Sequence, residues 1–250
     1  MFLDSSYLLW VLLPTIIISG LAQLFVRSAY SKWSKVGNST GLNGVEVAAR
    51  LNRSSLLNPV QLGEAAPGGA YQPAAMAVVQ VGESRGGELS DHFDPGNNTV
   101  NLSRGVATQP SIASMAIVAH EFGHVQQYQQ KSPLIVARQF LVPAVRFSPM
   151  LAGLLIMFGF LFRATGLIWV GIAFFGLTVL FMVLTLPVEI DASRRGLKLL
   201  TEAGLMQTDE DRSGSRTVLT AAATTYIAAA VTALLQLLYY ISLAQRSSRR

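Results

Sequence analysis

The sequence contains no cysteine and few charged residues. None of its 250 residues is a cysteine, so disulfide bonds and thiolate zinc sites are excluded, and a metal ion would have to be bound by histidine and carboxylate side chains. Only 13% of the residues are charged, against roughly 25% in soluble domains. Such a chain must hide much of its surface from water, either in a large core or in lipid.

The few charges that are present carry a basic excess. The formal net charge is +5, which on its own would be compatible with nucleic-acid binding. The Lys and Arg residues are scattered, however, and cluster beside apolar segments, as the positive-inside rule predicts for membrane proteins. We therefore expect no nucleic-acid partner.

Four apolar segments are candidates for crossing a membrane. A hydrocarbon layer of about 30 Å requires roughly 20 residues of helix. A linker of only four residues, 163–166, joins the second and third segments, which predicts a transmembrane hairpin that returns the chain to the side it left. The fourth segment is weaker because it is rich in Ala and Thr. The segments are residues 7–25, 149–162, 167–186 and 221–243.

The basic residues near the first apolar segment follow it. Asp4 precedes the segment, whereas Arg27, Lys32 and Lys35 come after it, which argues against a cleaved signal peptide. The positive-inside rule then places the N-terminus outside and the following domain in the cytoplasm. A last span would put the basic tail 246–250 outside, against this rule, so the orientation of the C-terminal segment stays open.

The polar region 28–147 is typical of a small α+β domain. Residues 44–52 predict an amphipathic helix, and residues 58–73 form a loop rich in Pro, Gly and Ala. Residues 78–81 and 99–102 have strand-like β-branched content, and Asp94-Pro95-Gly96-Asn97 predicts a turn between extended segments. We expect a small pair of strands here.

The sequence His120-Glu121-Phe122-Gly123-His124 carries the clearest chemical signal. It lies in a predicted helix of about 111–130 that Ser111 caps. Residues four apart share one helix face, so both imidazoles can bind one zinc ion at about 2.0–2.1 Å, while Glu121 can accept a proton from an activated water. The alternative is two ordinary polar histidines with an accidental Glu between them. Two of the three histidines in the chain lie four positions apart with a Glu between them, which favours the zinc interpretation.

A catalytic zinc needs a third protein ligand. Among the candidates, Glu189 is the best placed, because it begins a helix just after the hairpin returns to the side of the motif. Its alternative role is an acidic residue at a helix N-terminus, or a partner for Arg194 or Arg195. From the residues alone the two roles are nearly even. The candidates are His92, Glu189, Asp191 and Glu202.

Four sequence blocks around these residues resemble a known family. Together and in this order, they look like the bacterial YugP-type neutral zinc metallopeptidases of the membrane, and the resemblance covers most of the chain. They are far more specific than the H-E-x-x-H pattern alone. The blocks are residues 29–36, 89–95, 119–127 and 186–195.

This resemblance implies a gluzincin-like site in which the third zinc ligand is a Glu on a later helix. That residue would be Glu189 here, and Asp191 and Ser193 on the same helix would orient the ligands. The resemblance also implies Zn²⁺ as cofactor, a peptide or protein substrate, and the bacterial inner membrane as location. It leaves open a membrane protein partner or an oligomer.

Two further residues are candidates for catalysis. His92 could line the cleft and donate a hydrogen bond to the developing oxyanion. Its alternative is a turn histidine that bonds to its neighbours Asp91 and Asp94. Arg194 is also a candidate for catalysis, and its alternative role is a salt bridge.

The sequence thus predicts a mainly α-helical membrane protein with a small α+β zincin-like domain. It would hydrolyse peptide bonds, with an extended substrate bound at a strand edge. The alternatives are a non-catalytic scaffold or assembly factor with structural zinc, and a zinc hydrolase acting on a non-peptide substrate. The expected segments are 1–26 (transmembrane helix), 27–148 (metallopeptidase domain), 149–187 (transmembrane hairpin), 188–216 (ligand-bearing helix and loop), 217–245 (C-terminal transmembrane helix) and 246–250 (basic tail).

Overall fold

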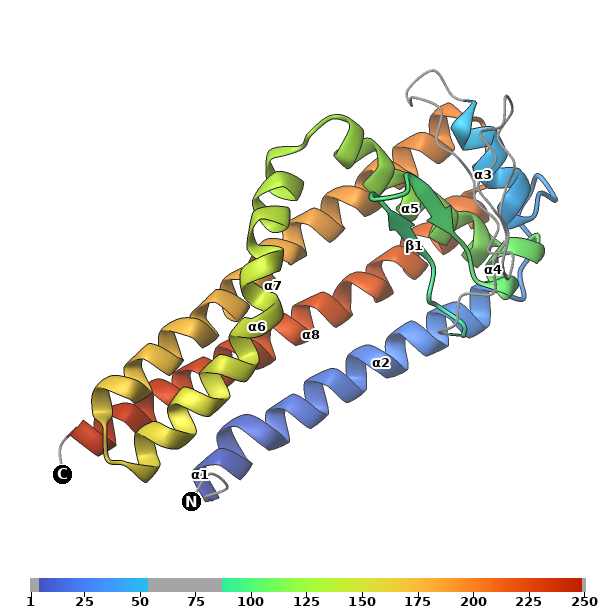
Figure 1. The fold of residues 1–250 in the computed structure, drawn as a ribbon. Coiled ribbons are helices and arrows are strands. Elements are labelled where there is room, and N and C mark those ends of the chain that lie inside the picture. Colours follow the sequence, from blue (N-terminus) through green and yellow to red (C-terminus); the bar gives the residue numbers. More distant parts are fainter. Residues whose placement is uncertain (1–4, 54–86, 249–250) are drawn as a thin grey trace. The chain divides into compact units, whose positions relative to one another are not determined.

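The structure, a computed structural model, describes residues 5–53 and 87–248 (Figure 1). These residues are mostly helical and include one two-stranded sheet. By contacts, the chain divides into unit 1 (Met1–Leu24, Pro133–Val188 and Ala223–Arg250) and unit 2 (Phe25–Ser132 and Glu189–Ala222). The elements are α1 (Ser5–Tyr7), η1 (Leu8–Leu12), α2 (Leu13–Trp33), α3 (Gly44–Asn52), β1 (His92–Asp94), β2 (Thr99–Asn101), α4 (Arg104–Thr108), α5 (Ile112–Gln129), α6 (Pro133–Leu161), α7 (Thr165–Glu202) and α8 (Asp209–Ser248).

Unit 1 contains the apolar parts of four long helical stretches. Within the described chain, Ser5–Trp33, α6, α7 and α8 are long and apolar enough to cross a membrane. Their most apolar windows are only 11% to 22% buried. Large apolar side chains such as Trp10, Phe140 and Phe162 are exposed, which is favourable in lipid and costly in water. The protein is therefore a mainly α-helical membrane protein, as predicted.

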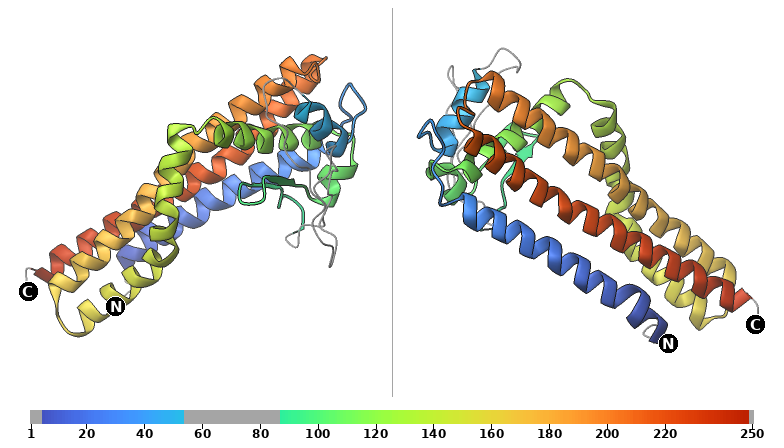
Figure 2. Two further views of the ribbon diagram at one scale, coloured as in Figure 1. Left: turned by 45° about the horizontal axis from the view of Figure 1, so that its top comes forward. Right: turned by 180° about the vertical axis from the view of Figure 1, so that it is seen from behind.

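The predicted hairpin is formed by α6 and α7. Both helices lie alongside α8 in unit 1 (Figure 2). A Cβ added at Gly159 would lie 2.5 Å from Ile168 Cγ1, and one at Gly171 would lie 2.7 Å from Ile156 Cγ1. Glycine at these two positions therefore lets the helices approach closely.

Two helices are longer than the sequence predicts. Pro187 was expected to end the hairpin, but α7 continues through it to Glu202. Proline removes one backbone hydrogen bond, and packing on both sides can still hold the helix; the neighbouring Val188 and Ala192 are fully buried. α6 likewise begins at Pro133, well before residue 149, and includes two internal prolines.

The loop expected at the end of segment 188–216 is also largely helical: α8 begins at Asp209, and its acidic residues form the first turn. The Thr208 hydroxyl accepts from the Asp211 amide at 3.1 Å, and the Asp211 carboxylate accepts from the Thr208 amide at 3.0 Å. This reciprocal capping satisfies donors at the helix start. Asp211 also accepts from the Ser39 amide at 3.0 Å, which ties the loop before α3 to α8.

Unit 2 contains the predicted small α+β arrangement. α3 has the predicted bounds, with a capping box between Asn43 and Glu46. The strand pair is formed by β1 and β2, which are antiparallel with Phe93 opposite Val100, so the predicted turn 94–97 lies between paired strands. The strand predicted at 78–81 and the loop at 58–73 lie outside the described residues.

Helix α5 lies at the centre of unit 2. Ser111 caps it as predicted, accepting from the Ser114 amide at 3.1 Å. Its buried side chains pack on one side against α3, α4, β2 and the end of α7, and on another against Trp33 and the start of α8. The helix that carries the histidines is therefore held from several directions. Its fully buried apolar residues include Met115, Val118, Ala119, Phe122 and Val125.

Candidate metal centre

The site depends on an unusually close packing of α5 against the polar end of α7. A Cβ at Gly123 would lie 2.1 Å from the carbonyl oxygen of Ala192, and one at Gly196 would lie 2.5 Å from that of Ala119. Each helix thus presents two small residues four positions apart, the arrangement that lets helix backbones approach. Gly123, inside the histidine motif, therefore allows the backbone of α7 to come close.

This packing brings the candidate third ligand to the histidine pair. The Oε2 atom of Glu189 lies 3.3 Å from Nε2 of His120 and 3.4 Å from Nε2 of His124. The candidate ligand atoms of the three residues all lie within 4.8 Å of one another. Two ligands of one tetrahedral zinc at about 2.0–2.1 Å are about 3.3–3.4 Å apart. These distances therefore fit a shared zinc ion.

The buried oxygen of Glu189 supports the same conclusion. Its Oε2 is inaccessible to solvent and has no hydrogen bond of acceptable geometry among the described residues, although two imidazole nitrogens face it. A buried carboxylate without compensation is costly. A cation between the three groups would satisfy Oε2 and both nitrogens together, so the residues present fit the metal.

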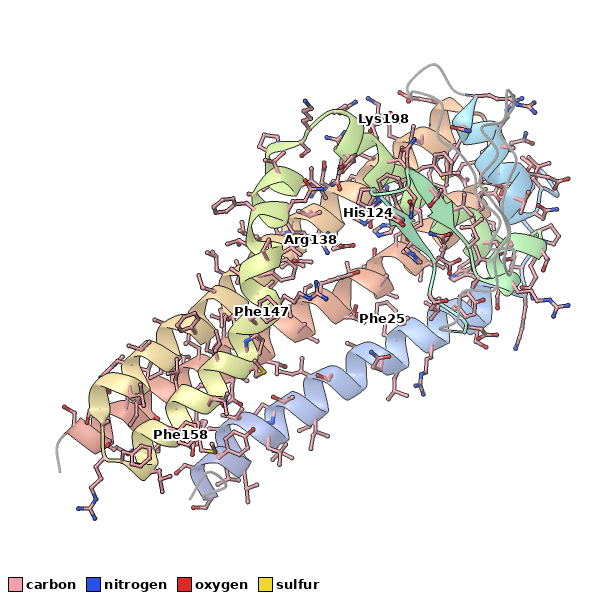
Figure 3. All side chains as sticks on the ribbon, in the orientation of Figure 1. Phe25, His124, Arg138, Phe147, Phe158 and Lys198 are labelled. Atoms are coloured by element: carbon pink, nitrogen blue, oxygen red, sulfur yellow. The ribbon has the colours of Figure 1, made fainter. Side chains whose placement is uncertain are left out.

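The other ring nitrogens are engaged elsewhere. Nδ1 of His120 lies 3.1 Å from the hydroxyl of Ser193, and Nδ1 of His124 lies 3.0 Å from Oε1 of Gln127. His124, labelled in Figure 3, lies on α5 close to β1. Partners at Nδ1 leave both Nε2 atoms for a metal ion, which is the usual arrangement for ligating histidine.

The charge around the site also favours a cation. Burial by itself lowers the pKa of His124, but the facing carboxylates of Glu189 and Glu121 outweigh it, so that the net pKa is raised above its usual value. Both glutamates are buried, at 4% and 7% exposure. Two buried carboxylates beside two imidazoles form a negative environment that a divalent ion would neutralise.

Glu121 is held by the first strand of the sheet. The backbone amide of Phe93 donates to its Oε2 at 2.8 Å, and the Phe93 ring makes an edge contact with Tyr128 of α5, with 5.9 Å between centroids. Along an antiparallel strand, backbone amides point alternately toward and away from the partner strand. The Phe93 amide bonds to Glu121 and therefore points away from β2. The edge of β1 that does not pair with β2 therefore faces the helix with Glu121.

Comparison with known proteins identifies the family. The sequence pattern of the family described as "Putative neutral zinc metallopeptidase" matches residues 8–245. The chain belongs to this family. It is also 34% identical over 224 residues to "Putative membrane protease YugP" of Bacillus subtilis (strain 168), covering 90% of each chain. No solved structure matches. The predicted resemblance is confirmed, and so is the predicted zinc cofactor.

In this member of the zinc metallopeptidase family, the structure brings together some of the predicted site residues. Ser193 contacts a histidine of the pair directly, whereas Asp191 reaches the other histidine through Gln127, whose amide nitrogen donates to Asp191 Oδ2 at 2.8 Å. Sequence reasoning missed Gln127. Its position one helical turn after His124 was the available signal.

Among the described residues, no hydrogen bond joins His92 or Arg194 to the three candidate ligands. His92 is exposed, with Nδ1 3.0 Å from Ser90 O and Nε2 3.2 Å from Nδ2 of Asn101. Its partners are thus not the aspartates proposed as the alternative. Arg194 is exposed, and the neighbouring Arg195 forms the ion pair with Asp191, at 2.7 Å. The catalytic roles of His92 and Arg194 stay predictions.

Proposed function

We propose that this protein is a membrane-bound zinc-dependent endopeptidase, in which His120, His124 and Glu189 hold the metal and Glu121 is the general base. The observation that carries the proposal is the position of Glu189 Oε2, 3.3 and 3.4 Å from the two Nε2 atoms, with a second buried glutamate adjacent on α5. Hydrolysis by activated water requires two histidine ligands, a third ligand such as a carboxylate, and a general base that does not bind the metal.

The residues of the chain have distinct tasks in this mechanism. Zinc, when bound, supplies Lewis acidity that makes a water molecule acidic near neutral pH. Glu121 accepts the proton of that water and passes it to the departing amine. The amide of Phe93 fixes one oxygen of Glu121, so the carboxylate has a defined direction before substrate binds. His92 would donate to the oxyanion if its predicted role holds.

The substrate would lie along β1. The edge of β1 that does not pair with β2 faces Glu121, and an extended peptide added beside the Phe93 amide would form main-chain hydrogen bonds next to the general base. Recognition would then depend more on the backbone than on side chains. Phe93 would link substrate binding to the orientation of the general base, since its strand would pair with the peptide while its amide bonds to Glu121.

A Glu121→Gln variant tests catalysis separately from metal binding. Glutamine has the same shape but cannot accept the proton, so turnover should fall by at least about 10²-fold while zinc content stays at the wild-type level. Mass spectrometry of a denatured protein substrate should detect new peptide termini with wild type and not with the variant.

The same measurement separates the alternatives. Wild type that retains zinc but releases no new termini from proteins or peptides would favour the scaffold or assembly factor. Loss of an amide bond from a lipid-linked compound without any peptide products would favour the non-peptide hydrolase. Termini produced equally by Glu121→Gln would contradict the assigned base.

We further propose that the protein lies in the bacterial inner membrane with unit 2 on the cytoplasmic side. The four apolar helical stretches support the membrane, and Arg27, Lys32 and Lys35 after the first of them support the orientation.

A further inference from the structure

Gln127 is a buried polar residue that the mechanism above leaves without a role. It lies one turn after His124 on α5 and is 0% exposed. Its two amide atoms have different partners: Oε1 lies 3.0 Å from Nδ1 of His124, and Nε2 donates to Oδ2 of Asp191 at 2.8 Å. A fully buried glutamine placed between an imidazole and a carboxylate can transmit the hydrogen-bonding preference of one to the other.

The surroundings of Asp191 decide which way this amide points. Arg195 donates from Nε to the same Oδ2 atom at 2.7 Å, and arginine can only donate. An oxygen that receives this ion-pair bond and a second hydrogen bond acts as an acceptor. A reversed amide would place the Gln127 oxygen against this carboxylate oxygen, which is repulsive. The amide oxygen of Gln127 must therefore face His124.

The orientation of the Gln127 amide in turn decides which ring nitrogen of His124 carries the hydrogen. An amide oxygen only accepts hydrogen bonds, so Nδ1 of His124 must carry the hydrogen. In a neutral imidazole the lone pair then lies on Nε2, the atom 3.4 Å from Glu189. We infer that Gln127, oriented by Asp191, is a positioning residue that fixes His124 in the tautomer presenting Nε2 to the metal. The inference rests on the proposed function of this site.

The second histidine is held differently. Nδ1 of His120 meets the hydroxyl of Ser193 at 3.1 Å, and a hydroxyl can either donate or accept. This contact does not select a tautomer. The two ligands are thus unequal: Nδ1 of His124 faces a group that can only accept, whereas Nδ1 of His120 faces one that can do either.

The carboxylate that orients Gln127 is itself anchored to α5. Nη1 of Arg195 donates to Oε1 of Gln126 at 3.0 Å and to Oε1 of Gln130 at 2.6 Å. The ion pair of Arg195 with Asp191 is therefore tied to the same helix that carries His124. This explains how a residue 64 positions away in the sequence can set the orientation of a side chain on α5.

Nitrogen NMR of the full chain tests this inference directly, because the sequence contains only three histidines. Full-length Glu189→Ala protein with ¹⁵N-labelled histidine, in detergent micelles, without metal and at a pH where the ring is neutral, should show His124 with hydrogen on Nδ1. The Glu189→Ala background is needed because the Glu189 carboxylate faces Nε2 at 3.4 Å and competes for a hydrogen there. The signal of His92, whose Nδ1 faces the Ser90 carbonyl oxygen, is identified by its loss in His92→Asn, and free histidine in the same buffer provides the reference for a mixed tautomer population. An even mixture or Nε2–H at His124 would overturn the inference.

Variants extend the test. In this background Gln127→Leu should give His124 a mixed tautomer population. In the otherwise wild-type chain it should weaken zinc binding by about 10- to 100-fold, as measured by chelator competition. Asp191→Asn, which keeps an acceptor for Gln127 and Arg195, should preserve the tautomer. The control is Gln109→Leu, the same change at an exposed position of unit 2 outside this network, and it should leave the tautomer unchanged.

The possible results separate the two claims. A fixed Nδ1–H tautomer in Glu189→Ala that survives the added Gln127→Leu change would overturn the role of Gln127. Failure of the wild-type protein to bind zinc or cleave peptides would remove the proposed function but would not alter the tautomer result, which is measured without metal. If the Gln127→Leu variant does not fold, the comparison of Asp191→Asn with Asp191→Leu in the same background decides, since only the leucine variant should lose the tautomer.

Discussion

Two glutamates and two histidines share one buried space on α5 and α7. Each carboxylate has a separate constraint: Glu121 accepts from the Phe93 amide at 2.8 Å, and Glu189 faces the two Nε2 atoms. Burial of two acidic groups beside the same pair of histidines is unfavourable unless positive charge compensates it. The arrangement is better explained by metal binding than by stability of the fold.

The residue scale also shows what a local pattern can and cannot predict. The histidine spacing and Glu121 are readable because all three lie within one helical turn or so, where position in the sequence determines position in space. Gln127 was equally close, so its contact with His124 could be predicted, but the orientation of its amide could not, because that depends on Asp191, 64 positions away. Partners distant in sequence require knowledge of how helices pack.

Ser193→Ala provides a prediction at this scale. The variant removes the Nδ1 partner of His120, and because Ser193 is only half-buried, water can take its place. Zinc affinity should therefore fall by about tenfold, the low end of the range for loss of a ligand-orienting group. Chelator competition measures the zinc affinity, with Ser213→Ala, at an exposed position of α8, as control. Unchanged affinity would show that Ser193 does not orient His120.

At the scale of elements, the packing of α5 against α7 determines whether the three ligands meet. Ala119 and Gly123 on one helix lie against Ala192 and Gly196 on the other. Glu189 is one turn before Ala192, so a small change in helix separation would move its carboxylate away from both imidazoles. The glycines are thus part of the metal site although they bind nothing.

Gly123→Ala tests this contact. The new Cβ would lie 2.1 Å from the Ala192 carbonyl oxygen, and backbone cannot yield easily, so the helices must separate. We expect destabilisation of roughly 1–3 kcal/mol and loss of most bound zinc, measured by thermal unfolding and metal analysis. Gly176→Ala on α7, with no atom within 4 Å of its Cβ, should change neither. Normal zinc content in Gly123→Ala would contradict this role.

The sequence predicted which elements exist better than where they end. Apolar length revealed the spans, the amphipathic pattern revealed the bounds of α3, and Ser111 revealed the start of α5. Pro187 suggested a helix end that the structure does not have, because buried neighbours hold α7 together. The polar residues at the start of α8 suggested a loop, but Asp211 caps the helix there. Tertiary contacts outweigh such local signals.

At the scale of the whole molecule, the open question is which side of the membrane unit 2 faces. The absence of cysteine makes a single introduced thiol unique. Gln109 is exposed in unit 2, so Gln109→Cys should react with an impermeant maleimide only after cells are permeabilised. Labelling of intact cells would place unit 2 outside and invert the orientation, while the spans themselves would stand.

Metal analysis of purified full-length wild type and Glu189→Ala tests the central claim most directly. The account predicts about one zinc per chain in wild type and strongly reduced zinc in the variant, because the alanine removes the oxygen that faces both Nε2 atoms. Glu202→Ala, an exposed glutamate on the same helix, should keep full zinc. Zinc retained at full occupancy in Glu189→Ala would contradict the proposed metal centre.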